Sequence, residues 1–370
     1  MTPNLNPTPT GNIIVFSPEL TIKQVNCYIR KFKKKYCLPV VKRYYKIFKG
    51  YATIVIPESV KLQLWTKYFD VIEIILDNFP TVITGYTSQW NMPRINIQRP
   101  ETSKTYPSIG FFVLDTGVTV TNGNMRVVEN RTFISSKTET TTNDLNGHGT
   151  FCASVIGTSF DQTIYGVLTN AEIHNYKCMD KNGSGSYDDI IDALNAVMEW
   201  QELNPTKRAV VNMSITSEVG NNNFSSLDYA VKQAISKNII VVAAAGNYYE
   251  DAKYYSPARV TEAFTVGAYD SSNVFATYSN YGSSVDILAP GTNIPGFNTS
   301  GGVTYLSGTS MATPHVVGVC GRYLVSNPSK TVQQVIDAIK ADSLNNSGNP
   351  KITNVPSGTT NVSVYSIYNV

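Results

Sequence analysis

The front of this 370-residue chain alternates short apolar runs with amphipathic segments. Residues 1–11 are polar and Pro-rich, which predicts a disordered tail. Beyond them, period-two and period-3.6 patterns predict strand, helix, two strands, helix and strand at residues 13–17, 21–35, 44–56, 57–69 and 71–76. That order predicts a small α+β domain over residues 12–80. The turn-rich segment 81–88 predicts a linker.

From residue 89 onward, wholly apolar runs alternate with helical patterns. The runs predict strands at 111–115, 209–214 and 239–246, and the 3.6-residue periods predict helices at 187–202, 225–237, 311–325 and 331–341. Continuous apolar runs are typical of parallel strands that are covered on both faces. The alternation therefore predicts an α/β fold, a doubly wound, mostly parallel sheet flanked by helices, over residues 89–370. Ligands bind at the carboxyl ends of such strands, so the polar residues there are the candidates for chemistry.

Composition and charge narrow the partners. With 42% hydrophobic residues the chain can bury a core, and since it lacks a run of 18 apolar residues we expect no membrane partner. Residues 1–85 hold 12 Lys and Arg against 5 Asp and Glu, a net charge of +7, and the rest of the chain holds 18 against 22, a net charge of −4. The basic N-terminal segment could therefore attract the acidic remainder of the chain. The cluster Lys31, Lys33, Lys34 and Lys35 could instead bind nucleic acid. We interpret it as a solvated helix face and expect no nucleic-acid partner.

Cysteines and the start of the chain bear on the compartment. The five cysteines are widely spaced, form no CxxC pair and are odd in number, which argues against both a metal cluster and a full disulfide framework. The first residues, MTPNLNPTPTGN, lack the basic and apolar regions of a signal peptide. We therefore expect a cytoplasmic location, or one in a particle such as a virion, rather than classical secretion.

Three short segments carry candidate catalytic groups. Asp115 ends the apolar run VLD, His148 lies between glycines in NGHGT, and Ser310 follows a Gly-rich turn and precedes a helical pattern. Each alone has a plain structural explanation as a cap or turn residue. Together they fit one reaction, because a serine hydroxyl needs a base and the base needs a carboxylate that orients it. At a helix N-terminus, Ser310 would have backbone N–H groups aimed at a developing oxyanion, and Asn247, after the run AAAG, could donate to the same oxygen.

The segments DTG, HGT, AAGN and GTSMATPH, in that order, resemble the subtilisin-like serine proteases, most closely the proteinase K branch. DKNGSGSYDDIIDAL, YYSPARVTEAFTVGAYD and YSNYGSSVDILAPGT are also similar to family segments, so the resemblance covers about residues 85–360. It implies a serine endopeptidase that needs no cofactor and is a monomer acting on peptides and proteins. Ser310 would be the nucleophile, His148 the general base and acid, and Asp115 the group that orients it. Asn247 and the Ser310 N–H would form the oxyanion hole.

The resemblance also implies a substrate-binding set. Gly183, Ser184 and Gly185 resemble the edge strand that pairs with an extended substrate, although GSGS alone would be taken for a turn. The rest of the expected set is Ser214, Ile215, Thr216, Ala245 and Gly246. Where the family usually has Ser-Leu-Gly-Gly, this chain has Ser214 to Ser217 followed by extra residues. Side chains in place of glycines would narrow the specificity pocket and favour small or medium apolar residues.

Further expectations come from matched positions. Asp286 and the backbone carbonyls of Thr261 and Ala263 resemble a calcium site of the family, and such hard oxygen ligands suit Ca²⁺. His174 and His315 are expected to be structural. Cys152 matches a buried free cysteine of the proteinase K branch and predicts partial sensitivity to mercurials. The cysteines that form disulfides in secreted members lack counterparts here, and Phe264 stands where one would be, which hints at folding under reducing conditions.

Residues 12–80 resemble the inhibitory propeptides of this family. The resemblance implies a zymogen that cuts its own chain between about Pro80 and Ser88, so that the own propeptide is a partner and the catalytic domain is 89–370. Without the family, a basic α+β domain could equally bind RNA or another partner. Two other functions remain open for the whole chain. One is a catalytically silent, subtilase-shaped interaction protein. The other is an esterase, which is disfavoured because Ala312 replaces the last Gly of a GxSxG elbow.

Overall fold

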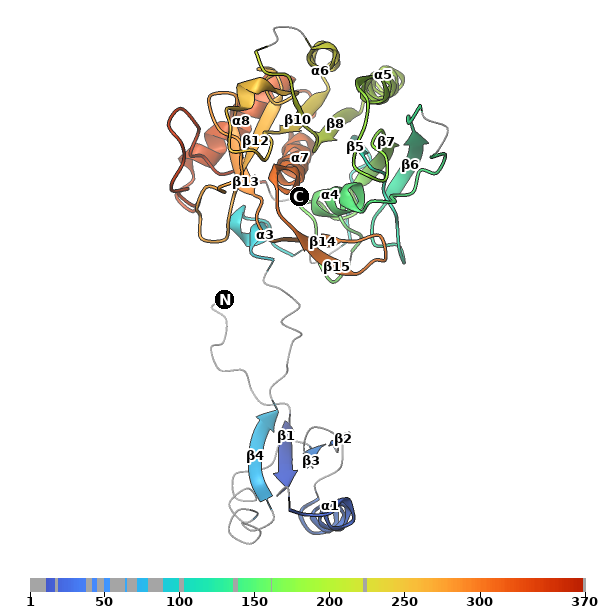
Figure 1. Cartoon of the computed structure of the whole chain (residues 1–370), viewed down its shortest axis with the longest axis vertical. Helices are drawn as coiled ribbons and strands as arrows, with labels where there is room; N and C mark the ends of the chain where they lie inside the picture. Colours follow the sequence, from blue (N-terminus) through green and yellow to red (C-terminus); the bar gives the residue numbers. More distant parts are fainter. Residues whose placement is uncertain are drawn as a thin grey trace. The chain divides into compact units, whose positions relative to one another are not determined.

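A computed structural model of the chain describes residues 11–16, 19–37, 42–44, 50–53, 64, 72–78, 89–99, 103–135, 139–160, 162–221 and 225–368. Internal contacts divide the chain into two units, Met1–Tyr86 and Thr87–Val370, which Figure 1 draws as separate bodies. Each unit is described by itself. Most of the expected tail and all of the expected linker 81–88 lie outside the described residues, and Gly11, assigned to the tail, already belongs to a strand.

The described residues of the first unit include the helix α1 and a four-stranded antiparallel sheet in the order β2-β3-β1-β4. Its elements are β1 (Gly11–Phe16), α1 (Ile22–Tyr36), β2 (Lys42–Tyr44), β3 (Gly50–Thr53) and β4 (Ile72–Asn78). Thr21 and Gln24 form a capping box that starts α1, and Val25, Ile29 and Phe32 are its buried face. The helix expected at 57–69 falls on residues of which only Leu64 is described, and that residue is helical.

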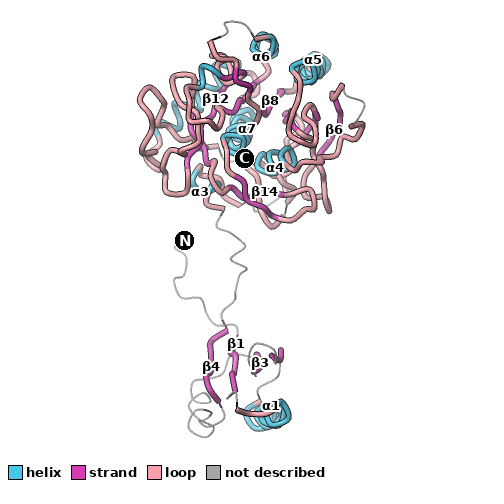
Figure 2. Tube along the Cα trace, in the orientation of Figure 1, coloured by secondary structure: helices cyan, strands magenta, loops and turns pink. Residues whose placement is uncertain are grey.

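A seven-stranded parallel sheet forms the centre of the second unit, in the order β13-β12-β10-β8-β5-β7-β6. Figure 2 shows its strands surrounded by helices. The strands are β5 (Ile109–Asp115), β6 (Val127–Thr132), β7 (Glu172–Lys177), β8 (Arg208–Met213), β10 (Ile240–Ala244), β12 (Phe264–Tyr269) and β13 (Ile287–Pro290). Two small antiparallel pairs lie outside it, β9 (Ser217–Glu218) with β11 (Tyr255–Ser256) and β14 (Ile294–Phe297) with β15 (Val303–Leu306).

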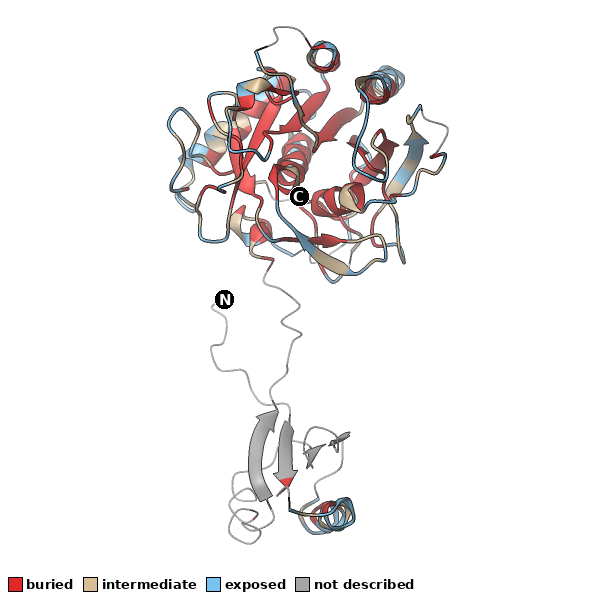
Figure 3. Ribbon diagram, in the orientation of Figure 1, coloured by how far each residue is buried: buried red, intermediate tan, exposed pale blue. Residues whose placement is uncertain are grey.

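The helices pack on both faces of this sheet, which confirms the predicted fold class. They are α3 (Asn91–Arg94), α4 (His148–Ile156), α5 (Tyr187–Leu203), α6 (Ser226–Ser236), α7 (Thr309–Ser326) and α8 (Val332–Asn345), with a short 3₁₀ helix η1 (Ala252–Tyr254). Phe111 and Val113 of β5 contribute to the core under α4, α7 and α8, whereas Phe112 and Leu114 contribute to the core under α5 and α6. Strand residues thus alternate between two cores, and Figure 3 shows α7 and the central strands mostly buried, whereas the edge strand β6 is partly exposed.

The elements expected from the sequence at β5, β8, β10, α5, α6, α7 and α8 are present with small shifts of their ends. The strands β6, β7, β12 and β13 and the hairpin β14–β15 were not predicted. In β7, with the sequence EIHNYK, all six residues are buried although four are polar. No helix within the described parts of the chain is long and apolar enough to cross a membrane.

Candidate active site

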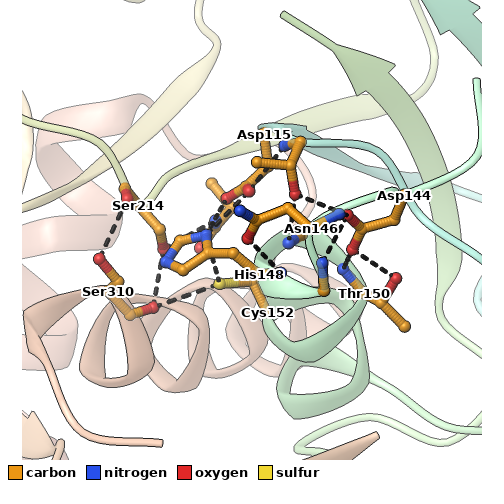
Figure 4. Close-up of polar contacts among 12 residues, drawn as sticks. Asp115, Asp144, Asn146, His148, Thr150, Cys152, Ser214 and Ser310 are labelled. Atoms are coloured by element: carbon orange, nitrogen blue, oxygen red, sulfur yellow. Dashed lines mark hydrogen bonds and ion pairs between the residues drawn. The ribbon is translucent and has the colours of Figure 1, made fainter. Parts of the chain in front are cut away.

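Asp115, His148 and Ser310 lie side by side at the carboxyl edge of the central sheet, although they are far apart in the sequence (Figure 4). Asp115 is the last residue of β5 and is 1% exposed. His148 is the first residue of α4, and Ser310 is the second residue of α7. Because the strands are parallel, the segments that follow them meet at one edge.

Both carboxylate oxygens of Asp115 face the imidazole of His148. His148 Nδ1 lies 2.8 Å from Asp115 Oδ1 and 3.0 Å from Oδ2. Burial alone would lower the pKa of His148, but the Asp115 carboxylate and, to a lesser degree, Cys152 together hold this pKa well above its ordinary value. With Nδ1 bound to a carboxylate, Nε2 is the nitrogen that can exchange a proton with another group.

Gly149 allows α4 to approach the Asp115 turn. A Cβ atom at Gly149 would lie 2.2 Å from the Gly117 carbonyl oxygen and 3.0 Å from Asp115 Cβ. Both distances are shorter than real contacts, so any larger residue would push His148 away from its carboxylate. The glycine after the histidine therefore has a packing reason that the sequence does not reveal.

The hydroxyl of Ser310 donates to the Ser214 carbonyl oxygen at 3.1 Å. Its own carbonyl has an unusual environment, because Pro314 lies four residues on in α7 and has no N–H to complete the helical bond. That carbonyl instead accepts from Ser214 Oγ at 2.8 Å and from Cys152 Sγ at 3.5 Å. Catalytic hydrogen bonds often tighten only when a substrate binds, so the Ser310 rotamer here leaves its reactivity open.

Asn247 follows β10 and is held by the first turn of α7. Its Oδ1 accepts from the Thr309 N–H at 2.8 Å and from Thr309 Oγ1 at 3.0 Å. These two bonds fix which end of the amide faces the helix. Its Nδ2 lies 3.4 Å from where a Cβ atom of Gly308 would stand, next to the Ser310 turn. The amide nitrogen is thus the end of Asn247 that can serve a ligand.

Asp144 is a site residue that sequence reasoning missed. It is 4% exposed, and its carboxylate accepts five hydrogen bonds. Oδ1 accepts from Thr116 Oγ1 and from the N–H groups of Asn146 and Gly147, and Oδ2 accepts from Thr150 N and Oγ1. These bonds lower the pKa of Asp144 against the opposing effect of burial. Asp144 thereby ties the turn after Asp115 to the helix that begins at His148 (Figure 4).

Two adjoining cavities lie beside these groups. The first, of about 330 Å³, is lined by Asp115, Thr116, Asn146, His148, Met179, Asn182, Gly183, Ser214, Ile215 and Thr216. The second, of about 230 Å³, is lined by Met179, Gly183, Ser184, Gly185, Tyr187, Ile190, Ile215, Thr216, Ser217, Leu227 and Ser256. Six of the eight expected substrate residues line one or both cavities. Ala245 and Gly246 line neither; Ala245 is buried, and Gly246 donates its N–H to Thr309 Oγ1 at 3.1 Å.

Comparisons with known proteins agree with this geometry. Residues 54–359 match the model of the subtilase family. The chain belongs to the subtilase family. It is 38% identical over 259 residues to the extracellular serine proteinase of a Thermus species, with 68% of this chain and 60% of that protein covered. It is 33% identical over 340 residues to Proteinase R of Parengyodontium album, with 88% of this chain and 81% of that protein covered.

A solved structure supports the same family. The crystal structure of a cold adapted subtilisin-like serine proteinase matches this subtilase with a TM-score of 0.64 and 33% identity, covering 76% of this chain and 98% of that one. The chain spans 60%, 48% and 53% of the lengths of the Thermus proteinase and of two further curated relatives. The fold of this subtilase is therefore subtilisin-like.

Thr216 and Ser217 occupy the wall where this subtilase departs from the family pattern. Ser217 and Glu218 form β9, which pairs with β11 at Tyr255 and Ser256. Thr216 Cγ2 would lie 3.7 Å from a Cβ atom placed on Gly246, across from it. A threonine methyl group thus faces the Gly246 backbone, and the narrowing of the specificity pocket stays a prediction.

The expected calcium ligands do not fit the ion as they stand. Asp286 Oδ1 accepts from Lys340 Nζ at 2.9 Å, and Oδ2 accepts from the Thr265 N–H at 3.0 Å. Both oxygens of the Asp286 carboxylate are thus engaged by protein groups, one of them by a lysine ammonium, and a calcium ion bound there would have to displace Lys340. Within the described residues, the one cluster of three or more potential metal-binding side chains is Asp115, His148 and Cys152, which is the site described above.

Three further residues considered in the sequence, His315, His174 and Cys152, are buried. His315 Nδ1 contacts the Met311 carbonyl oxygen at 2.9 Å and its Nε2 contacts Asn91 Nδ2 at 2.8 Å, and burial lowers the pKa of His315 to about 4. His174 bonds to Glu129, and burial lowers its pKa as well. Cys152 is buried, with Sγ 3.9 Å from His148 Nδ1, and burial raises the pKa of its thiol. All five cysteines are free thiols.

Proposed function

We propose that this subtilase is a serine endopeptidase with Asp115, His148 and Ser310 as its catalytic triad. The observation that carries the proposal is the contact of both Asp115 carboxylate oxygens with His148 Nδ1, on an imidazole next to a serine at a helix start. The names of the relatives, which are serine proteinases, agree with this assignment.

The reaction uses these groups in turn. His148 Nε2 takes the proton of the Ser310 hydroxyl while Oγ attacks the peptide carbonyl, and the Asp115 carboxylate stabilises the imidazolium. The imidazolium then gives its proton to the amine nitrogen as the C–N bond breaks, which leaves an acyl-enzyme. Water repeats the sequence: His148 takes its proton, hydroxide adds to the ester, and Ser310 leaves with that proton. The raised pKa of His148 suits the acid half of each step.

Asn247 and the Ser310 N–H would stabilise the oxyanion. The Thr309 contacts that hold Asn247 Oδ1 leave Nδ2 as the donor. The first N–H groups of α7 have no partner within the helix and lie at its positive end. A preorganised pair of donors of this kind acts where negative charge develops.

Substrate would bind as an extended strand along Gly183 to Gly185, opposite Ser214 to Thr216. Residues of both segments line the two cavities. A backbone laid between them can pair with exposed N–H and C=O groups, which favours unfolded or extended peptides and proteins over small esters.

We further propose that residues 12–80 are an inhibitory propeptide and that the chain cuts itself within residues 81–88. The second unit holds residues 87–370, 284 of 370 residues, or about 77%, whereas the match to Proteinase R covers 88% of the chain. The similarity therefore extends into the first unit. The basic front and the acidic remainder also favour association. The mature enzyme is proposed to be a monomer.

A serine-directed fluorophosphonate probe tests the proposal. The full chain is expressed as wild type and as Ser310→Ala, and both are labelled, sequenced at the N-terminus and assayed on a peptide library. We expect labelling and a new N-terminus between residues 81 and 89 in the wild type, and neither in Ser310→Ala. A wild type that stays unlabelled points to the catalytically silent interaction protein instead, and labelling that survives Ser310→Ala shows that Ser310 is not the nucleophile.

A further inference from the structure

A buried ion pair lies directly behind the Asp115 turn. Lys177 is the last residue of β7 and the register partner of Asp115 on β5. Its side chain is 0% exposed, and its Nζ donates to the Thr116 carbonyl oxygen at 2.5 Å. Glu139 Oε2 lies 3.2 Å from the same Nζ and is 8% exposed. Both charges are thus taken out of water beside the residue that follows Asp115.

The other oxygen of Glu139 contacts the segment that lines both cavities. Glu139 Oε1 accepts from the Lys181 N–H at 3.0 Å. The Lys181 carbonyl in turn accepts from Asn146 Nδ2 at 3.0 Å, so both backbone groups of this residue are held by side chains. Asn146 itself lies two residues before His148, and its Oδ1 accepts from the His148 N–H at 3.2 Å.

Lys181 belongs to a turn whose shape is set locally. Asp180 N donates to the Ser184 carbonyl oxygen at 2.7 Å, and Asp180 Oδ1 accepts from the N–H groups of Asn182 and Ser184. These bonds make residues 180–184 a rigid unit. The position of this unit is set by two hydrogen bonds at Lys181, from its N–H to Glu139 and from Asn146 to its carbonyl. The strand that ends at Lys177 also contributes.

Keeping two charges at this depth is costly unless both are paired. An apolar pair would fill the same volume without the desolvation cost, but it could not hold the Thr116 carbonyl and the Lys181 N–H at the same time. The ion pair therefore fixes two backbone groups, the Thr116 carbonyl and the Lys181 N–H, which apolar packing could not do. Neither side chain lines the cavities, and each binds a backbone group of a neighbouring segment, so both act through those segments rather than on a substrate.

We propose that Glu139 and Lys177 are positioning residues that set the place of the substrate-binding segment 180–185 relative to the Asp115–His148 pair. The proposal rests on the proposed function. It assigns the pair to recognition of long, extended substrates, whose residues before the scissile bond lie along Gly183 to Gly185. A substrate with one residue before the scissile bond does not reach that segment and does not sense the pair.

Two peptide substrates test the proposal. Both have the same leaving group and the same residue directly before the scissile bond. The short substrate ends at that residue, and the long substrate carries three further residues before it. The variants of the full chain are Glu139→Ala, which removes the acceptor for the Lys181 N–H, and Glu139→Gln, which keeps an acceptor oxygen. The control is Glu172→Gln, which removes the buried charge that pairs with the partly exposed Arg126 (Nη1 to Oε1, 2.7 Å) at the opposite end of β7.

For Glu139→Ala we expect kcat/KM on the long substrate to fall about tenfold, mainly through KM, the size expected from a lost backbone alignment. On the short substrate it stays within about twofold of wild type. For Glu139→Gln we expect a loss of kcat/KM on the long substrate between those of wild type and Glu139→Ala. For Glu172→Gln we expect the kcat/KM of wild type on both substrates. If Glu139→Ala does not fold, Glu139→Gln carries the same length comparison.

Equal losses on both substrates would mean that Glu139 only supports the fold, and unchanged kinetics would mean that it has no role; either result overturns the proposal. Failure of the proposed function looks different. In that case the wild type itself neither hydrolyses the short substrate nor takes up the fluorophosphonate.

Discussion

Buried charged residues lie at both edges of the central sheet, but they are used differently at the two edges. At the amino edge, Glu172 pairs with Arg126 and Arg208 donates to the carbonyl oxygens of Pro328, Lys330 and Asn238. Every such contact closes on another part of the same chain. At the carboxyl edge, Asp115 also binds a neighbour, but that neighbour, His148, lines a cavity. The difference teaches that burying a charge serves the fold, whereas leaving its partner open to a cavity serves chemistry.

The largest expected effect comes from removing a donor at the carboxyl edge. Asn247→Ala is expected to lower kcat by about 10²–10³, the size known from a subtilisin, with little change in KM, because the oxyanion forms only in the transition state. Steady-state kinetics on a peptide substrate measure this. A change in KM alone would assign Asn247 to ground-state binding.

At the amino edge the expected effect is on stability. Arg208→Met leaves three carbonyl oxygens without their donor, and the free energy of unfolding is expected to fall by about 2–3 kcal/mol. Urea unfolding in a Ser310→Ala background, which avoids self-digestion, measures it. At 25 °C the kcat/KM of Arg208→Met should equal that of wild type. A loss of kcat/KM in the folded variant would contradict the division between the edges.

The pH dependence of activity distinguishes the histidines of the two environments. Protonated His148 cannot accept the Ser310 proton, and its pKa is raised, so kcat/KM should fall about tenfold per pH unit below a limb lying above pH 6.5. His174 has a lowered pKa and should leave no trace in this limb. In Asp115→Asn the limb should move to lower pH as the rate drops. A limb below pH 6.5 in wild type would show that Asp115 does not control His148.

The smallest expected effect concerns Lys340. Its pair with Asp286 is partly exposed, with side chains 41% and 22% exposed, so Lys340→Met is expected to cost about 1 kcal/mol or less. Because the ammonium supplies the cation at Asp286, a chelator should leave the Tm of wild type unchanged. The variant should instead gain stability on adding calcium. A drop in the wild-type Tm on chelation would indicate that calcium is bound at Asp286 and that Lys340 does not take its place.

Much of the second unit was predictable because its central strands are apolar throughout. Strands such as β5 and β8 stand out by composition, and their polar last residues or followers mark the site. Strand β7 was not predicted because His174, Asn175 and Lys177 are polar, and polar residues in a sequence usually indicate an exposed segment. They are buried only because Glu129, the Thr142 carbonyl and Glu139 lie opposite them, and these partners come from distant segments.

The site divides in the same way. Asp115, His148, Ser310 and Asn247 could be singled out because each ends or follows a strand or lies at the start of a helix in a recognisable segment, and their catalytic roles stay a proposal. Asp144 and Glu139 were missed because their partners are backbone N–H groups, which have no signature in the sequence. The calcium site expected at Asp286, Thr261 and Ala263 stays a prediction, and nothing near Asp286 in the sequence indicates its contact with Lys340 of α8.

The proline inside α7 has a consequence for motion. Since Pro314 cannot bond to the Ser310 carbonyl, that carbonyl is attached sideways, to Ser214 beyond β8 and to Cys152 of α4. Thermal bending or sliding of the long helix is therefore not passed to Ser310 along an axial hydrogen bond. The proposed nucleophile is instead tied, through its carbonyl, to the segment after β8 and to α4, the helix that begins at His148.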